Sequence, residues 1–216
     1  MLGELFNNPI ALFSWLVALV VAITIHEFAH AYAADRLGDP TPRVQGRLTL
    51  NPLAHLDPLG TLMILIARFG WGKPVVFDPF NLRHPRRDAA IISLAGPASN
   101  LALATALSVV LHSFLTTPYA MLIYVIIQPV IVMNVFLAIF NLVPIHPLDG
   151  FKIVGGILPR EYARQWQELE PYGMIFLLFL VFPVFGGTAP MSKFISPVIN
   201  FFLSLLLPGP GAAGVI

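Results

Sequence analysis

The chain has 216 residues, of which 57% are hydrophobic and only 11% charged, and its mean hydropathy is +0.80. This composition excludes an ordinary soluble domain and indicates an integral membrane protein. The formal net charge of +1 gives no case for nucleic-acid binding. The chain contains no cysteine, which excludes disulfides and thiolate ligands, so any metal must be held by histidine and carboxylate side chains.

The first apolar segment, residues 9–34, is long enough to cross a hydrocarbon core about 30 Å thick. The residues before it carry no positive charge, which favours a retained helix over a cleaved signal peptide. Within this segment lies the sequence His26-Glu-Phe-Ala-His30, and Glu27 is the only charged residue from position 10 to position 34. Ionisable groups at membrane depth are costly, so these three side chains are functional candidates.

The spacing of the two histidines predicts a zinc site. On a helix, positions four apart lie about 40° apart on one face and ~6 Å apart along the axis, so two imidazoles can bind one Zn²⁺. Glu27 points toward the same side of the helix. The alternative is a pair of histidines that pack between helices beside a paired glutamate.

Residues 35–88 connect the first span to the next. The alternation of polar and apolar residues over Arg43–Asn51 predicts a β-strand, and Val75–Phe77 is a candidate second strand. Asp57 is interpreted as a helix cap before the apolar stretch Pro58–Phe69, which is too short to cross and is predicted to be re-entrant. His55 is interpreted as an interfacial histidine.

The second half of the chain contains further membrane segments. No Asp, Glu, Lys or Arg occurs from residue 89 to residue 148, a length that predicts two crossings joined by a hairpin near Thr117-Pro118. Two shorter apolar runs follow, at Tyr172–Gly186 and Phe194–Pro208, and the sequence leaves open whether they span.

These segments predict a single all-α polytopic membrane domain over residues 1–216. It should contain about three core transmembrane helices, a short re-entrant segment with small β-strands, and one or two C-terminal membrane segments. The catalytic core would cover about residues 10–150, and the C-terminal membrane segments residues 172–208.

The distribution of positive charge predicts the orientation in the cell membrane. Every Lys and Arg except Lys193 falls within residues 35–88 or 150–171. The positive-inside rule then places those segments in the cytoplasm and the N-terminus outside. With a re-entrant 58–69 segment, the histidine pair and Asp149 arrive at the same, cytoplasmic, membrane face.

Three motifs in this order resemble the site-2 protease family of intramembrane zinc metalloproteases: His26–His30, Ala95-Gly-Pro-Ala-Ser-Asn100, and the segment Asn141–Gly150. The resemblance covers roughly residues 10–150 and is to the compact prokaryotic type without a PDZ domain. His146 departs from the pattern of related chains, which often have an apolar residue or proline there, and is a candidate spare ligand or proton carrier.

The resemblance implies a zinc-dependent endopeptidase that cleaves transmembrane or membrane-anchored segments near the cytoplasmic face. His26, His30 and Asp149 would bind Zn²⁺ and leave one position for water, and Glu27 would be the general base. The alternatives are turn chemistry for Asp149 and orientation of a histidine for Glu27. The resemblance suggests that Asn100 contacts the substrate or the developing oxyanion; the alternative is a hydrogen bond between helices.

The expected partners are a transmembrane protein substrate and the lipid bilayer. A helix hides its carbonyl groups, so the substrate must unwind, and the predicted Arg43–Asn51 strand, alone or together with Val75–Phe77, could bind it by strand addition, with Arg47 and Leu48 in contact with the peptide. The oligomeric state stays open. The competing functions are a metal transporter, which usually shows repeated halves, and a catalytically inactive membrane scaffold.

Overall fold

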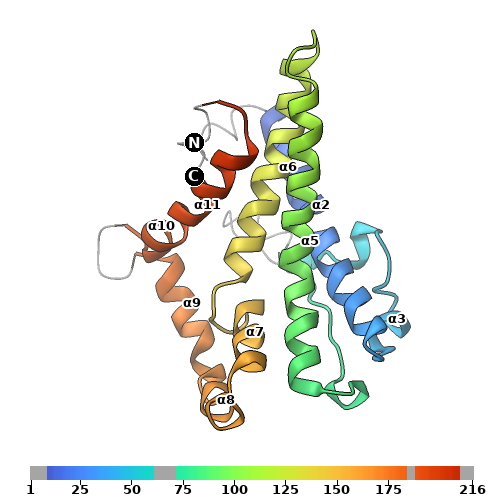
Figure 1. Ribbon diagram of the computed structural model, residues 1–216, viewed down its shortest axis with the longest axis vertical. Helices are drawn as coiled ribbons and strands as arrows, with labels where there is room; N and C mark the ends of the chain where they lie inside the picture. Colours follow the sequence, from blue (N-terminus) through green and yellow to red (C-terminus); the bar gives the residue numbers. More distant parts are fainter. Residues whose placement is uncertain (1–8, 61–71, 184–187, 210–216) are drawn as a thin grey trace.

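The computed structural model describes residues 9–60, 72–183 and 188–209, and these residues form a helical molecule with its long helices side by side (Figure 1). The elements in chain order are α2 (Pro9–Arg36), α3 (Thr41–Val44), η1 (Pro52–Ala54), η2 (Pro79–Asn81), α5 (Pro85–Ser113), α6 (Ala120–Asn141), α7 (Asp149–Ile157), α8 (Arg160–Gln167), η3 (Glu170–Tyr172), α9 (Gly173–Val181), α10 (Pro190–Phe194) and α11 (Ser196–Leu206).

Among the described residues, three helices are long and apolar enough to cross a membrane: α2, α5 and α6. This finding confirms the expected number of core transmembrane helices. α5 packs against both α2 and α6, and α2 also contacts α6, so the three form one bundle. The polar end of α5 additionally packs against α7, which brings the segment after α6 back to the bundle.

The second C-terminal apolar segment packs along α6 through a buried cluster that includes Ile131 and Val135 of α6 and Ile199 and Leu203 of α11, and Leu180 of α9 packs against the same cluster. At about 1.5 Å per residue, α9 with 9 residues and α11 with 11 are each too short to cross a bilayer alone. In Figure 1 they follow one another from the α8 end of the molecule toward the α5–α6 hairpin. Neither helix is a membrane span by itself, and whether the two apolar runs span together stays open.

The structure does not confirm the predicted β-strands. Over the described residues it contains no strand, only an isolated antiparallel bridge between Leu56 and Gly72. The predicted strand at Arg43–Asn51 begins inside α3 and continues as turns, and Val75–Phe77 has no regular secondary structure.

Local chemistry explains why the alternating pattern of Arg43–Asn51 was misleading. Pro42, which has no backbone N–H to give a ladder, lies in the first turn of α3. Gly46 turns the chain with a φ of +68°, a left-handed conformation that favours glycine. At the far end the Asn51 side chain accepts the N–H of Leu53 and caps η1.

The predicted re-entrant segment lies mostly outside the described residues. Asp57 is the cap expected from the sequence, since its Oδ1 accepts the backbone N–H of Gly60 at 2.7 Å. Residues 61–71 are not described, so the re-entrant path of Pro58–Phe69 stays a prediction.

Candidate metal centre

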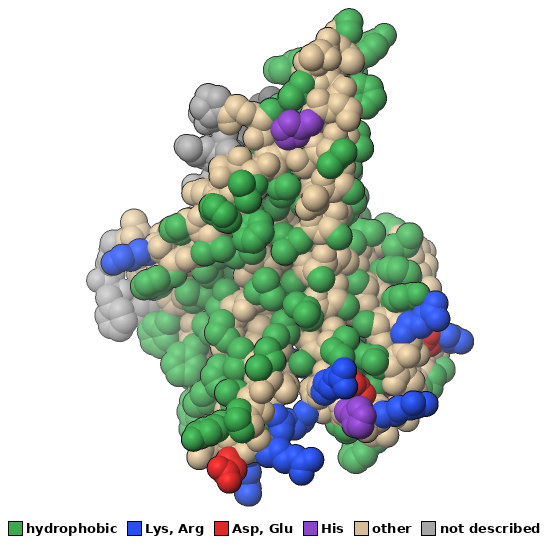
Figure 2. Space-filling model, in the orientation of Figure 1, with side chains coloured by type: hydrophobic (Ala, Val, Ile, Leu, Met, Phe, Trp, Pro, Cys, Tyr) green, Lys and Arg blue, Asp and Glu red, His purple; other side chains and the backbone are tan. Residues whose placement is uncertain are grey.

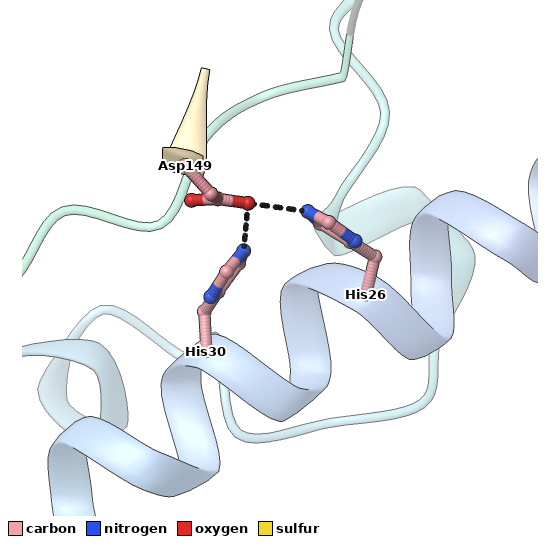
Figure 3. A group of neighbouring side chains, drawn as sticks. All are labelled: His26, His30 and Asp149. Atoms are coloured by element: carbon pink, nitrogen blue, oxygen red, sulfur yellow. Dashed lines mark hydrogen bonds and ion pairs between the residues drawn. The ribbon is translucent and has the colours of Figure 1, made fainter. Parts of the chain in front are cut away.

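Two histidines from one helix and an aspartate from another element converge on one point (Figure 3). His26 and His30 lie one turn apart on α2, and Asp149 is the first residue of α7. Oδ2 of Asp149 lies 3.1 Å from Nε2 of His26 and 3.2 Å from Nε2 of His30. The three potential ligand atoms lie within 4.8 Å of one another.

The protein holds both imidazoles in the orientation that metal binding requires. Nδ1–H of His26 donates to Oδ1 of Asn100 at 2.6 Å, and Nδ1–H of His30 donates to the carbonyl of Ile92 at 2.7 Å. Both partners are acceptors, so they fix the proton on Nδ1 and leave each Nε2 lone pair directed toward Asp149. Both histidines are buried, so these bonds form away from competing solvent.

Gly96 of α5 allows the two rings to lie against the helix backbone. A Cβ atom at this position would stand 2.4 Å from Nε2 of His30 and 2.7 Å from Cε1 of His26. Both distances are well below van der Waals contact, so any larger residue would displace the rings. The close approach that Gly96 permits therefore occurs at the histidines themselves.

Asp149 is placed by the close approach of its neighbour to the end of α6. A Cβ atom at Gly150 would stand 2.3 Å from the carbonyl oxygen of Leu142 and 2.4 Å from that of Val143, so only glycine fits. Burial opposes ionisation of Asp149, but the neighbouring His30 and His26 hold the pKa of this carboxyl well below its usual range. The aspartate is therefore available as an anionic ligand.

Glu27 lies between the two histidines in sequence, and its carboxylate is held by the backbone. Oε2 of Glu27 accepts the N–H of Val75 at 2.9 Å. Val75 belongs to residues 73–78, which have no regular secondary structure and lie 48 positions after Glu27. The carboxylate is thus oriented by a segment remote in sequence.

The donor set fits zinc. Two imidazole nitrogens and one carboxylate oxygen are common ligands of a catalytic zinc site, where a fourth position stays open for water. In a tetrahedral site with bonds of about 2.0–2.1 Å, ligand atoms lie roughly 3.3 Å apart. The separations of 3.1 and 3.2 Å from Asp149 to the two histidines match this geometry.

Comparison with known proteins identifies the family. YwhC of Bacillus subtilis, provisionally named a zinc metalloprotease, is 40% identical over 188 residues, which are 82% of this chain and 84% of YwhC. The chain belongs to the site-2 protease family of zinc metalloproteases. It is therefore a metallopeptidase with a Zn²⁺ cofactor.

More distant relatives of this site-2 protease are longer. Rip2 of Mycobacterium tuberculosis, also provisionally named a zinc metalloprotease, is 34% identical over 77% of the chain, which spans 64% of Rip2. Zinc metalloprotease MJ0392 of Methanocaldococcus jannaschii is 23% identical over 74% of the chain and 39% of that protein. No family model and no solved structure match the chain.

Asn100 of the site-2 protease is fully buried behind His26. Its amide Nδ2 donates to the carbonyl of Ala22 at 3.0 Å and to Oδ1 of Asn134 at 2.7 Å, while Oδ1 accepts from His26. The side chain is thus engaged with α2 and α6. Substrate contact by Asn100 stays a prediction, and the observed bonds favour a role in orienting His26.

The remaining histidines near the predicted site have other partners. Nδ1 of His146 lies 3.7 Å from Oε1 of Glu170, and the clustered ligand atoms do not include this histidine. His55 is fully buried and its Nε2 lies 2.7 Å from the carbonyl oxygen of Thr49, so it is not an interfacial residue.

Arg47 and Leu48 do not lie on a strand edge. Arg47 is only 4% exposed, and its guanidinium donates to the backbone carbonyls of Ala54, Lys73 and Pro74. This arrangement does not present Arg47 to a peptide, and contact of Leu48 with substrate stays a prediction.

Sequence reasoning missed the groups that orient the site-2 protease's catalytic side chains. The Ile92 carbonyl and the Val75 N–H are backbone groups, which leave no signature in the sequence. Asn134 had a usable signal, because it is a polar residue within an otherwise apolar predicted span.

Proposed function

We propose that this protein is an intramembrane endopeptidase that hydrolyses peptide bonds in transmembrane or membrane-anchored segments near the cytoplasmic face. The observation that carries the proposal is the convergence of Asp149 with His26 and His30 of α2, a helix that can span a membrane. A hydrolytic site built into such a helix can reach peptide bonds that lie within or beside the bilayer.

His26, His30 and Asp149 are the proposed zinc ligands. Bound there, zinc would lower the pKa of its water toward ~7 and polarise the scissile carbonyl. Glu27, with Oε2 fixed by Val75, would take a proton from the attacking water and donate it to the leaving amide nitrogen. Asn100 would keep His26 in the tautomer that binds the metal.

The segment Val75–Phe77, which lies in no helix, is the proposed binding site for an unwound substrate. It adjoins Glu27 through the Val75 N–H, and strand addition would lay a peptide along the remaining backbone groups of this segment. This assignment replaces the Arg43–Asn51 strand, which the structure lacks.

Charge distribution supports the proposed orientation. Figure 2 shows the visible Lys and Arg side chains gathered at the end of the molecule formed by α8, α3 and the start of α5, apart from one near α10. The hairpin between α5 and α6, at the opposite end, carries no Lys or Arg over residues 112–119. By the positive-inside rule the basic end faces the cytoplasm and the N-terminus lies outside.

The test compares wild type with Glu27→Gln in detergent, measuring zinc content and cleavage of a test transmembrane substrate. We expect about one zinc per chain in both proteins, and at least a hundredfold slower cleavage by Glu27→Gln because the base is lost. Glu161→Gln, an exposed carboxylate on α8, is the matched control and should cleave like wild type.

The competing functions give different results. A metal transporter would still transport metal in Glu27→Gln, and an inactive scaffold would still bind its partner. Neither would cleave a substrate, even as the wild-type protein. Equal cleavage by wild type and Glu27→Gln would contradict the assignment of the base.

A further inference from the structure

Arg47 is a buried cation whose hydrogen bonds in the described structure go to backbone carbonyls. Nη2 donates to the carbonyl of Lys73 at 2.9 Å and to that of Pro74 at 2.8 Å, and Nη1 donates to the carbonyl of Ala54. A buried charge is stable only when it is well hydrogen-bonded, so the guanidinium depends on these acceptors. Arg47 therefore joins the loop after α3 to the segment that follows residue 72.

The same segment is fixed at its start by the loop around His55. The N–H of Lys73 donates to the carbonyl of His55 at 2.8 Å, and Leu56 pairs with Gly72 in the isolated bridge. His55 is itself held, with its ring Nε2 at the carbonyl oxygen of Thr49. Residues 72–74 are thus bound on one side by the 47–56 loop.

The next residue contacts Glu27. The Val75 N–H donates to Oε2 of Glu27 at 2.9 Å, one residue after the Pro74 carbonyl that Arg47 binds. The Pro74 carbonyl and the Val75 N–H belong to the same planar peptide unit, so Arg47 and Glu27 bind one rigid group from two sides. A displacement at the Arg47 end is therefore transmitted to the Val75 N–H.

We propose that Arg47 is a positioning residue for catalysis: its guanidinium holds the Lys73–Pro74 carbonyls so that the Val75 N–H orients the carboxylate of Glu27. This inference rests on the proposed function of Glu27 as the base. It assigns Arg47 to the reaction without any contact with substrate or metal, in place of the substrate contact expected from the sequence.

The first variant is Arg47→Gln, measured for zinc content, kcat and KM in detergent. We expect kcat to fall about tenfold or more while zinc stays at the wild-type level, because the metal ligands do not depend on this segment. Arg47→Lys should recover part of kcat, since an ammonium group can still donate to one carbonyl. Arg43→Gln is the matched control: Arg43 is exposed, pairs with Asp35, and should leave kcat unchanged.

A double-mutant cycle distinguishes positioning from general destabilisation. Val75→Pro removes the N–H that reaches Glu27 and should lower kcat as Arg47→Gln does. If both act through one path, the double variant loses little more than the worse single variant. Losses that multiply would overturn the inference, as would wild-type kcat in Arg47→Gln.

Hydrogen–deuterium exchange provides a readout that needs no activity. In Arg47→Gln the amides of Lys73 and Val75 should exchange at least tenfold faster than in wild type, with Arg43→Gln unchanged. Unchanged exchange there would overturn the inference even if cleavage fell. If wild type binds zinc but cleaves nothing, the proposed function fails, and exchange still decides whether Arg47 holds this segment.

Discussion

At the scale of single residues, small and uncharged groups decide whether the two histidines can bind a metal. Asn100 and the Ile92 carbonyl set the tautomers, and Gly96 leaves the space in which the rings lie. Partners of this kind typically contribute 10–100-fold to metal affinity. Metal binding by the two histidines therefore depends on the residues of α5 that contact their rings.

The substitution Gly96→Ala tests this dependence. The added Cβ would stand 2.4 Å from Nε2 of His30, so we expect zinc affinity to fall at least tenfold, measured by competition with a chelator. Alanine is intrinsically about 1 kcal/mol better than glycine within a helix, so loss of zinc would not reflect a poorer helix. Gly155→Ala on α7 is the control, because its Cβ would lie at an ordinary contact distance of 3.4 Å from Trp166. If Gly96→Ala binds zinc with wild-type affinity, the packing argument is contradicted.

At the scale of elements, the turn between α2 and α3 depends on one buried carboxylate. Asp39 accepts hydrogen bonds from the N–H and hydroxyl of Thr41, the N–H of Asp78 and the amide of Asn81. It therefore ties the end of the metal-binding helix to the chain before α5.

The pH dependence of this turn is predictable. Burial opposes ionisation of Asp39, but its hydrogen bonds outweigh that cost and lower its pKa below the ordinary value of 3.8. The ionised group then contributes its full stability above pH ~4 and loses it as pH falls toward the folded-state pKa. Asp39→Asn should lower the melting temperature at pH 7, as expected for the loss of about 1.5–3 kcal/mol from a charge-assisted hydrogen bond.

Thermal melting in detergent from pH 7 to pH 3 measures this effect. The gap between wild type and Asp39→Asn should stay constant down to about pH 5 and narrow below pH 4, because only wild type loses a stabilising charge. Glu161→Gln on exposed α8 controls for a change of charge alone. A gap that widens on acidification would mean that the sign of the pKa shift is wrong.

At the scale of the whole molecule, the two ends of the bundle differ in charge. The α8 end is basic and the α5–α6 hairpin is uncharged, which is the asymmetry on which the proposed orientation depends. The site lies toward the basic end, since α7 begins at Asp149 and leads directly into α8.

Single cysteines test the orientation directly, because the native chain has none. Thr116→Cys in the hairpin should react with a membrane-impermeant maleimide in intact cells. Glu161→Cys on α8 should react only after the membrane is permeabilised; both positions are exposed. The reverse pattern would place the basic end outside and contradict the proposed cytoplasmic site.

The sequence by itself determined what depends on local order and composition. Long apolar runs predicted the three core helices, and the i, i+4 histidines with their glutamate indicated the zinc site. The prediction of a strand at Arg43–Asn51 was wrong, because it rested on the alternation of polar and apolar residues alone. Pro42, Gly46 and the Asn51 cap favour turns over strand pairing.

Only the tertiary structure decided which groups face the site. Asp149 reaches His26 across 123 positions of sequence, and Val75 reaches Glu27 across 48. Contacts of this kind depend on how helices pack, and those to Ile92 and Val75 use backbone atoms that every residue carries. Arg47 was predicted from the sequence to contact the substrate, because the sequence does not reveal how the chain packs around it. In the fold Arg47 is buried, and its guanidinium donates to three backbone carbonyls instead.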